Sequence, residues 1–317
     1  MLKDMNKYLI SVIIPTFGRP AGLKAAIDSV LKQTYKPIEI IVVDDNAPDS
    51  KYRVETEAVM REFFLVHEIN YAQRSVNGGG ALARNTGVEM AKGDLITFLD
   101  DDDEYLPEKI EKQVNQFVNQ NIELSLCGMR AKNNGRPLKY IKGIPVGRNL
   151  KEMTLYGNVL TPMIMVTRDL LNAVGGFTNT PRFQDHLLML KLLKKTDKVG
   201  IIEEGLYIHN IHPFERISFS KNSRVGYIKK QEVENENRNI LSKKEQQDLD
   251  VRQRQEILRC DLEEGTILGR VRLIVNLIAS EKSFRGVRSN TVFAAKYVLS
   301  KFSIVHFVRN NIIWKTE

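Results

Sequence analysis

The sequence predicts an α/β protein whose mostly parallel sheet is flanked by helices and followed by a helical C-terminal region. Through the first 120 residues, apolar segments of strand length alternate with segments of helical spacing, which is typical of parallel sheets covered on both faces. Two of the predicted strands end in neighbouring aspartates, at 44–45 and 100–103. From about residue 224 the sequence becomes polar and helix-favouring, with neither Pro nor Gly at 227–260.

The first predicted strand is 8–14, an Ile- and Val-rich segment that ends at Pro15. Apolar residues at helical spacing predict a helix at 20–33. The next apolar strand, 38–43, runs directly into the first aspartate pair. The same alternation then predicts a helix at 54–65, a short strand at 66–71, a helix from 81 that stops near Gly93, a strand at 94–99 and an amphipathic helix at about 107–119.

The pattern is looser in the second half of the chain. It predicts a strand at 122–129, a Gly- and Pro-rich loop region at 133–150, a strand at 158–166, a turn at Gly175-Gly176-Phe177 and a helical stretch at 187–193. Beyond these, it predicts one long polar helix at 226–260 and shorter basic amphipathic helices at 266–279 and 289–313.

Composition fits a globular protein: 317 residues, 42% hydrophobic and 27% charged, allow one large domain or two of ordinary size. The cysteines, Cys127 and Cys260, have no zinc-type spacing and are too few for a disulfide framework. The sequence shows no signal peptide and no apolar run of about 18 residues. The expected location is therefore the cytoplasm.

Strand 94–99 runs directly into Asp100-Asp101-Asp102-Asp103. Four adjacent carboxylates repel one another, and a bound cation relieves that repulsion. Mg²⁺ and Mn²⁺ take oxygen ligands and commonly bridge one or two carboxylates to a substrate's phosphates. Because parallel strands end at the same edge of a sheet, both aspartate groups predict a nucleotide bound across that edge with a metal at its phosphates. The alternative interpretation of the cluster is a solvated acidic turn.

Several motifs together resemble the family 2 glycosyltransferases of bacterial type, with a C-terminal helical extension. The motifs are Val12–Pro20, Val42–Asn46, Ala83-Arg84-Asn85 with Gly87, and Phe98–Asp103, in the family's order and spacing. The resemblance covers about 8–220 and implies a GT-A type fold. It implies a catalytic domain at 1–222, with a nucleotide-sugar half at about 1–104 and an acceptor half at about 105–222, followed by the extension at 223–317.

The resemblance implies roles for individual residues on the nucleotide side. Asp45 matches the residue that contacts the base, usually uracil. Asp100 and Asp102 match the two ends of a D-x-D motif, and Asp102 is the expected ligand of Mn²⁺ or Mg²⁺. His212, slightly favoured over His209, is expected at the metal or diphosphate. The remaining residues expected to bind the nucleotide sugar are Pro15, Thr16, Phe17, Arg19, Arg84 and Asp101, with Asn85 beside them.

Asp185 is the candidate catalytic base, because it follows the 175–177 turn at the family's usual interval. A carboxylate on the acceptor side can take a hydroxyl proton as the sugar carbon is attacked, and direct attack with one base implies inversion. The sequence departs from the family's pattern at Gln184, where an acidic residue is common, and at Leu187. An alternative role for Asp185 is the N-cap of the following helix, and both roles can coexist.

The resemblance implies transfer from a nucleotide-diphospho sugar, UDP-linked, to a hydroxyl of a glycan or lipid-linked acceptor in cell-surface polysaccharide synthesis. The segment 226–317 holds 17 Lys and Arg against 12 Asp and Glu, so +5 of the chain's +8 lies there. The helix predicted at 289–313 within this tail either lies on the inner face of an anionic membrane as a peripheral contact or packs on the catalytic domain or a second copy of the chain.

Two other functions compete with this reading. Nucleotidyl transfer also unites such a sheet with acidic metal ligands, but Pro15-Thr16-Phe17 stands where a Gly-rich phosphate loop with a Lys would follow the first strand. Nucleic-acid binding would require Lys, Arg and aromatic residues on one domain face. Because the basic excess lies in the tail, no nucleic-acid partner is expected.

Overall fold

The computed structural model describes residues 8–133, 135–211, 223–264 and 290–291. The chain divides into two compact units. The first comprises the residues up to Asn179 together with Gln184–His212, and the second comprises Thr180–Phe183 together with the chain from Pro213 onward. The predicted domain boundary at 222–223 borders residues outside the described ranges and stays a prediction.

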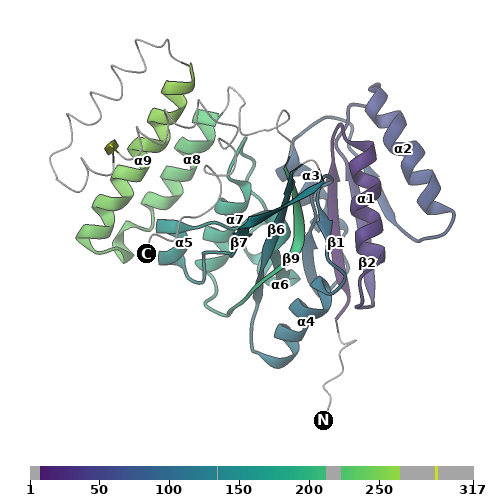
Figure 1. The fold of residues 1–317 in the computed structure, drawn as a ribbon, viewed down its shortest axis with the longest axis horizontal. Helices are drawn as coiled ribbons and strands as arrows, with labels where there is room; N and C mark the ends of the chain where they lie inside the picture. The colour runs from purple at the N-terminus through teal and green to yellow at the C-terminus, as the bar shows by residue number, and fades with distance from the viewer. Residues whose placement is uncertain (1–7, 134, 212–222, 265–289, 292–317) are drawn as a thin grey trace. The chain divides into compact units, whose positions relative to one another are not determined.

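The described residues of the first unit form one nine-stranded sheet of order β3-β2-β1-β4-β8-β6-β9-β5, with β7 paired to β6 (Figure 1). Its N-terminal half is parallel, as predicted. The C-terminal half is mixed: β8 is antiparallel to both neighbours, whereas β6 and β9 are parallel. The strands are β1 (Ile10–Thr16), β2 (Ile38–Asp44), β3 (Asn70–Gln73), β4 (Leu95–Phe98), β5 (Glu104–Tyr105), β6 (Leu124–Asn133), β7 (Arg136–Gly143), β8 (Ile164–Thr167) and β9 (Val199–Ile211).

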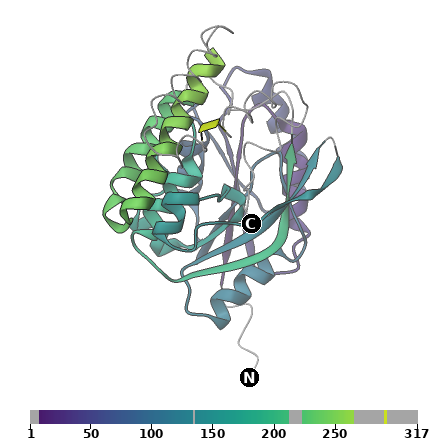
Figure 2. The same ribbon diagram turned by 60° about the vertical axis from the view of Figure 1, so that its left-hand side comes forward.

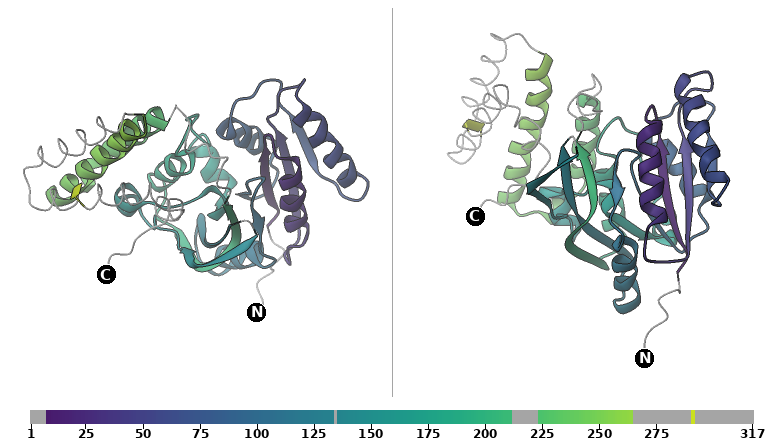
Figure 3. Two further views of the ribbon diagram at one scale, coloured as in Figure 1. Left: turned by 45° about the horizontal axis from the view of Figure 1, so that its top comes forward. Right: turned by 45° about the vertical axis from the view of Figure 1, so that its right-hand side comes forward.

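Helices cover the sheet, so the predicted α/β class is confirmed. Both α1 and α3 contact β1, and α1 also contacts α2, beside which it lies in Figures 1 and 3. Pro20 opens α1, at a position where a missing N–H costs nothing. The helices of this unit are α1 (Pro20–Leu31), α2 (Lys51–Phe64), α3 (Gly80–Met90), α4 (Lys109–Asn119), α5 (Leu150–Tyr156), the 3₁₀ turn η1 (Thr161–Met163), α6 (Arg168–Ala173) and α7 (Gln184–Leu193).

The core lies on both faces of the central strands. Ile10, Val12, Ile13 and Ile14 of β1 are all fully buried, as expected for a parallel strand with helices on each side. Helix α3 approaches closely at Gly87, where a Cβ would meet Ile13 Cγ2 at 2.4 Å. This close approach brings the helix that carries Arg84 directly onto the strand that ends at the acidic edge.

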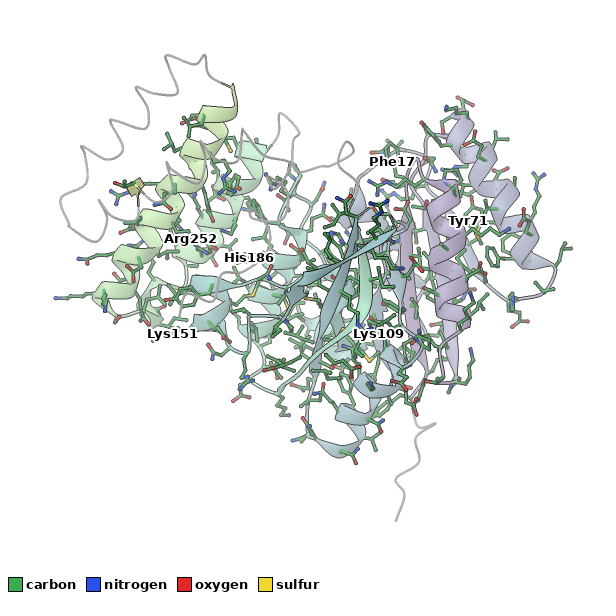
Figure 4. All side chains as sticks on the ribbon, viewed as in Figure 1. Phe17, Tyr71, Lys109, Lys151, His186 and Arg252 are labelled. Atoms are coloured by element: carbon green, nitrogen blue, oxygen red, sulfur yellow. The ribbon has the colours of Figure 1, made fainter. Side chains whose placement is uncertain are left out.

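The charged side chain of Lys109 lies within this core. Lys109 of α4 is fully buried (Figure 4), and its ammonium donates to Thr97 Oγ1 at 3.1 Å and Gln113 Oε1 at 2.7 Å. The ammonium also lies 4.0 Å from the centroid of the Tyr105 ring. Burial lowers the pKa of Lys109 to about 8, because the charged form is poorly solvated there.

The structure differs from the prediction in the second half of the chain. The region predicted as a loop at 133–150 contains β7, which pairs antiparallel with β6. Gly135, in a left-handed conformation (φ 74°), makes the connecting turn, and an Asn-Gly dipeptide at 134–135 is a hairpin signal. The strand β9 and the short helices α5 and α6 were also not predicted.

The second unit contains a helical hairpin, defined here as 223–264, in which α8 (Ser223–Asn235) and α9 (Lys243–Glu264) lie side by side (Figures 1 and 2). The prediction of one helix over 226–260 is wrong, because the chain turns through the 3₁₀ segment Arg238–Ile240. Ser242 then caps α9: its hydroxyl accepts from Glu245 N at 3.3 Å, and Glu245 Oε2 accepts from Ser242 N at 2.8 Å.

The predicted helices at 266–279 and 289–313 lie outside the described residues, apart from 290–291. None of the helices in the described ranges combines the length and the apolar character needed to cross a membrane.

Candidate functional site

The polar residues predicted from the strand ends lie on one edge of the sheet. Thr16 and Asp44 are register partners at the ends of β1 and β2, and Ile13 is paired with Phe98 near the end of β4. The chain continues past each of these ends into the segments predicted to bind a nucleotide sugar. The parallel arrangement of the three strands therefore places these segments side by side.

Asp101 holds the segment that follows β1. Its Oδ2 accepts hydrogen bonds from Thr16 Oγ1 at 2.9 Å and from the backbone N–H of Phe17 at 3.1 Å, and its Oδ1 lies 3.3 Å from Arg19 Nη1. Burial raises the pKa of Asp101 to about 7, and neighbouring Asp102 adds to the effect. The side chain thus points inward and fixes the backbone around the edge.

Arg19 also pairs with Asp102, the predicted metal ligand, at 2.9 Å between Nη1 and Oδ2. The Asp102 side chain retains 18% of its exposure, whereas that of Asp101 retains 6%. Pro15 is half-buried, and Phe17, labelled in Figure 4, is 58% exposed. The predicted residues Arg19, Phe17 and Asp102 therefore offer a cation, an aromatic face and a carboxylate at one place.

Asp45, predicted to contact the base, is fixed by the start of α3. Its carboxylate accepts from Gly78 N at 3.0 Å and from Gly79 N at 2.7 Å, and Oδ1 forms an ion pair with Arg74 Nε at 2.8 Å. Gly79 has a φ of 81°, which favours glycine there. Sequence reasoning did not identify Arg74, because the pairing depends on the tertiary fold.

The adjacent Asp44 is fully buried and has its own partners. Arg53 Nε lies 3.2 Å from Oδ2, and the hydroxyl of Tyr71 donates to the same oxygen at 2.6 Å (Tyr71 is labelled in Figure 4). Burial and the bond to Asp44 raise the pKa of Tyr71 above its usual value. A buried aspartate pair requires compensating cations, but which residues supply them, here Arg53 and Arg74, is decided by the tertiary fold.

Arg84 of α3 joins the acidic cluster to α7. Its Nη2 lies 2.5 Å from Asp100 Oδ1, and its Nη1 donates to Gln184 Oε1 at 2.9 Å. The guanidinium carbon lies 5.5 Å from the centroid of the Phe177 ring. Gln184, the departure from the family's acidic residue, thus still accepts a hydrogen bond from this arginine.

Asn85, the neighbour of Arg84, holds the predicted 175–177 turn. Its Oδ1 accepts from Phe177 N at 2.8 Å, and its Nδ2 donates to Phe177 O at 2.9 Å. Gly176 has a φ of 61°, and a Cβ there would lie 2.5 Å from Asn85 Oδ1. The two adjacent residues of α3 therefore fix both the turn and the start of α7.

Asp185, the predicted base, lies in the first turn of α7. The helix begins at Gln184, so Asp185 is within the helix and not its N-cap. Its Oδ1 accepts from the N–H of His186 at 2.7 Å. Burial raises the pKa of Asp185 to about 6, although Arg84 and the His186 N–H oppose the shift. A carboxylate with that pKa is ionised at neutral pH and accepts protons readily.

His209 on β9 faces the same acidic segment. Its Nδ1 lies 3.1 Å from both oxygens of Asp103, and Asn210 donates from its backbone to Asp103 at 3.0 Å and from Nδ2 to Asp102 O at 2.8 Å. Burial lowers the pKa of His209, but Asp103 outweighs this and raises it overall. Burial in turn raises the pKa of Asp103. His212, the favoured histidine, lies outside the described residues.

The acidic edge fits a divalent cation shared with a ligand's phosphates. Within the described ranges, no three His, Cys, Asp or Glu side chains converge on a point where they alone could hold a metal. Mg²⁺ and Mn²⁺ are usually bound by one or two carboxylates, water and substrate phosphates. Asp100 and Asp102 are partly exposed and offer that number of oxygen donors.

The sequence pattern of "Glycosyl transferase family 2" matches residues 11–174. An uncharacterized glycosyltransferase of Methanocaldococcus jannaschii is 30% identical over 74% of this chain and 79% of its own length. One of Haemophilus influenzae is 31% identical over 59% of this chain, which covers 63% of that relative. The UDP-Glc:alpha-D-GlcNAc-diphosphoundecaprenol beta-1,3-glucosyltransferase WfgD of Escherichia coli is 36% identical over 41% of this chain, and the match spans about half (49%) of WfgD.

Two solved structures share the fold at low sequence identity. Staphylococcus aureus TarS in complex with UDP-GlcNAc superposes with a TM-score of 0.62 at 18% identity, over 95% of this chain and 87% of that structure. The mannosyltransferase PcManGT of Pyrobaculum calidifontis, in complex with GDP-Man and Mn²⁺, gives a TM-score of 0.58 at 14% identity, over 93% of this chain and 88% of that structure.

Proposed function

Because the chain belongs to glycosyl transferase family 2, we propose that it is an inverting, metal-dependent enzyme that uses a UDP-linked sugar. The resemblance found in the motifs is thereby confirmed, and so is the GT-A type fold. The proposed acceptor is a hydroxyl of a glycan or a lipid-linked saccharide in cell-surface polysaccharide synthesis. WfgD, which acts on a diphosphoundecaprenol-linked sugar, supports this acceptor class.

One observation carries the proposed mechanism: a single guanidinium joins the acidic cluster to the helix of the predicted base. Arg84 contacts Asp100 at 2.5 Å and Gln184 at 2.9 Å, and Asp185 is the next residue. A base that takes a proton from the acceptor hydroxyl must lie near the group that holds the leaving diphosphate. The Arg84 bridge supplies such a connection.

In the proposed reaction, the Asp185 carboxylate takes the acceptor's hydroxyl proton while that oxygen attacks the anomeric carbon from the side opposite the nucleotide. The C–O bond forms as the bond to the diphosphate breaks, so the configuration inverts. Asp45 would orient the nucleobase, and Arg19 and Phe17 would contact other parts of the nucleotide. A cation, when bound, would offset the charge that develops on the leaving diphosphate; Asp102 and Asp100 are the described residues that would hold it, and a contribution from His212 stays a prediction.

A donor panel tests this function. UDP-, GDP- and CMP-sugars are incubated with the protein and Mn²⁺, and the release of UDP, GDP or CMP is followed with and without saccharide acceptors. UDP-sugars are expected to be consumed. Asp185→Asn should lower transfer about 10²–10⁴-fold, the typical contribution of a general base, and should leave donor binding unchanged. If no nucleotide sugar is bound or consumed, the proposed function is wrong; release of a sugar phosphate in place of the nucleoside diphosphate would favour nucleotidyl transfer.

The other predicted partners remain predictions. The basic segment proposed to contact a membrane surface or protein, 289–313, lies almost wholly outside the described residues. Self-association is likewise a proposal, as is a peripheral position on the inner face of the cell membrane. Binding of the intact protein and of the 1–280 fragment to anionic liposomes would compare the tail's contribution directly.

A further inference from the structure

The segment 180–183, which leads into the helix of the proposed base, belongs to the same compact unit as the helical hairpin. Phe183, its last residue, has a φ of 62°, the left-handed region that side chains other than glycine rarely adopt. It is the one non-glycine residue with positive φ among the described residues. Such a conformation persists only where the surroundings hold it in place.

Side chains of α8 supply those surroundings. The Phe183 ring packs on the Tyr227 ring, with 4.7 Å between centroids. The Arg182 guanidinium lies 4.9 Å from the Phe183 centroid and 5.1 Å from the Tyr227 centroid, and Lys230 Nζ lies 5.3 Å from the Phe183 centroid. Two cations thus lie near a pair of tilted aromatic rings, and the electrostatic attraction between a cation and an aromatic face favours this arrangement.

The backbone of α8 approaches the same segment at Gly226. A Cβ at Gly226 would lie 2.8 Å from Arg182 Cβ and 3.3 Å from Arg182 N. Because Gly226 is helical and weakens α8 relative to alanine, its presence is explained by this close approach.

Lys230 is anchored in both helices of the hairpin. Its ammonium lies 3.2 Å from Glu234 of α8 and 2.5 Å from Glu256 of α9. Glu234 is fully buried and also accepts from Arg252, labelled in Figure 4, at 2.7 Å and from Gln253 at 3.1 Å. The cation that contacts Phe183 therefore depends on a buried polar network joining α8 to α9.

We propose that the helical hairpin is a positioning device for the proposed base: through Tyr227, Gly226 and Lys230 it holds Phe183 in its left-handed conformation. That conformation sets the direction in which the chain enters α7, whose second residue is Asp185. This inference rests on the proposed function of Asp185. The three hairpin residues are positioning residues that act through segment 180–183.

Paired variants of α8 test this inference. Tyr227→Ala removes the ring contact with Phe183, and Gly226→Ala pushes α8 against Arg182 while raising the helix propensity of α8. Both should lower kcat at least about tenfold with the donor KM unchanged, because a displacement of about 1 Å at a catalytic group costs roughly 10²-fold. Tyr227→Phe keeps the ring and should restore wild-type kcat. Ile228→Ala, at a position on α8 that is 44% exposed, is the matched control and should leave kcat unchanged.

Hydrogen exchange of the amides at 184–190 gives a readout that needs no substrate. Exchange there should accelerate in both variants while exchange within α9 stays as in the wild type. If Tyr227→Ala fails to fold, Gly226→Ala decides. Wild-type kcat and unchanged exchange in a folded variant would overturn the inference, as would equal changes in kcat and KM. If the wild-type protein transfers no sugar, the proposed function fails and the exchange data alone decide on the positioning.

Discussion

Among single residues, compensation of charge governs the acidic edge. Asp44 pairs with Arg53, Asp45 with Arg74, and Arg19 with both Asp101 and Asp102. Each partner comes from a different part of the chain, so the aspartates are ordered before any ligand binds. Arg84 pairs with Asp100 and also donates a hydrogen bond to Gln184 of α7.

The variant Arg84→Lys tests whether the two-acceptor geometry of the Arg84 guanidinium matters to the reaction beyond its positive charge. An ammonium keeps the positive charge but lacks the planar fork that contacts two acceptors at once. Loss of one charged hydrogen bond costs about 1.5–3 kcal/mol, so kcat/KM should fall roughly ten- to hundredfold. The matched control is Arg61→Lys, at a side chain that is 77% exposed. Equal kcat/KM values for the two variants would show that the bridge does not matter to the reaction.

The raised pKa of Asp185 predicts a pH dependence. A base acts only when ionised, so the fraction of active enzyme falls as pH drops through about 6, the pKa to which burial raises Asp185. We expect kcat/KM to be level from pH 7 upward and to fall tenfold per unit well below pH 6. Initial rates between pH 5 and 9, with circular dichroism at each pH to confirm folding, measure this. A profile that stays level down to pH 5 would contradict Asp185 as the base.

At the scale of elements, the hairpin depends on its internal turn. The Ser242–Glu245 capping box begins α9 immediately after the 3₁₀ segment, so a reversal of the chain occurs without Gly or Pro. Leu249, Leu258 and Leu262 of α9 are buried, and the cap fixes which face of the helix carries them inward.

Ser242→Ala should lower the free energy of unfolding by about 1 kcal/mol, the usual cost of losing an N-cap side chain. Chemical denaturation followed by circular dichroism measures this change. Ser242→Asp keeps an accepting side chain at the cap and serves as the control, with a stability close to the wild type. An alanine variant as stable as the wild type would mean that the observed cap contributes nothing to the hairpin.

The elements that could be predicted are those with one continuous signal. Strands β1, β2 and β4 are buried on both faces and read as uninterrupted apolar runs. Strand β9 is harder to predict, because Glu203 and Glu204 lie exposed within it and its register with β6 shifts nearby. The break between α8 and α9 was missed because a polar sequence without Gly or Pro favours a continuous helix, and only the capping box marks the stop.

For the whole molecule, the metal-dependent step offers a direct test of the acidic edge. Asp102→Ala should remove the stabilisation that Mn²⁺ and UDP together give, while the unliganded melting temperature stays unchanged. In the wild type, ligand at 100 times its Kd should add about 2.7 kcal/mol. Asp197→Ala, at an exposed site away from the edge, is the control. A ligand-induced shift that survives in the Asp102 variant would remove this residue from the metal site.

The strand pattern by itself predicts only those site residues that follow strand ends, whereas Arg84, Asp185 and His209 were implied by the family's motifs. Asp44–Asp45 and Asp100–Asp103 follow apolar strands, so their common edge is implied by parallel pairing alone. Arg74 and His209 lie in segments with no such signal, and only the fold brings them to Asp45 and Asp103. The cationic partners of buried carboxylates are distant in sequence, so the hydrophobic periodicity along the chain does not predict them.

The Asp45 carboxylate is clamped by two glycine amides and an arginine before a nucleotide arrives. If the Asp45 carboxylate contacts the nucleobase as proposed, the nucleobase site is already ordered before binding. Little binding free energy is then lost in ordering the Asp45 side chain. Discrimination between bases would then come from a rigid template and not from an adaptive loop. Exchanging the preferred base would require rebuilding the glycine turn as well as the acid.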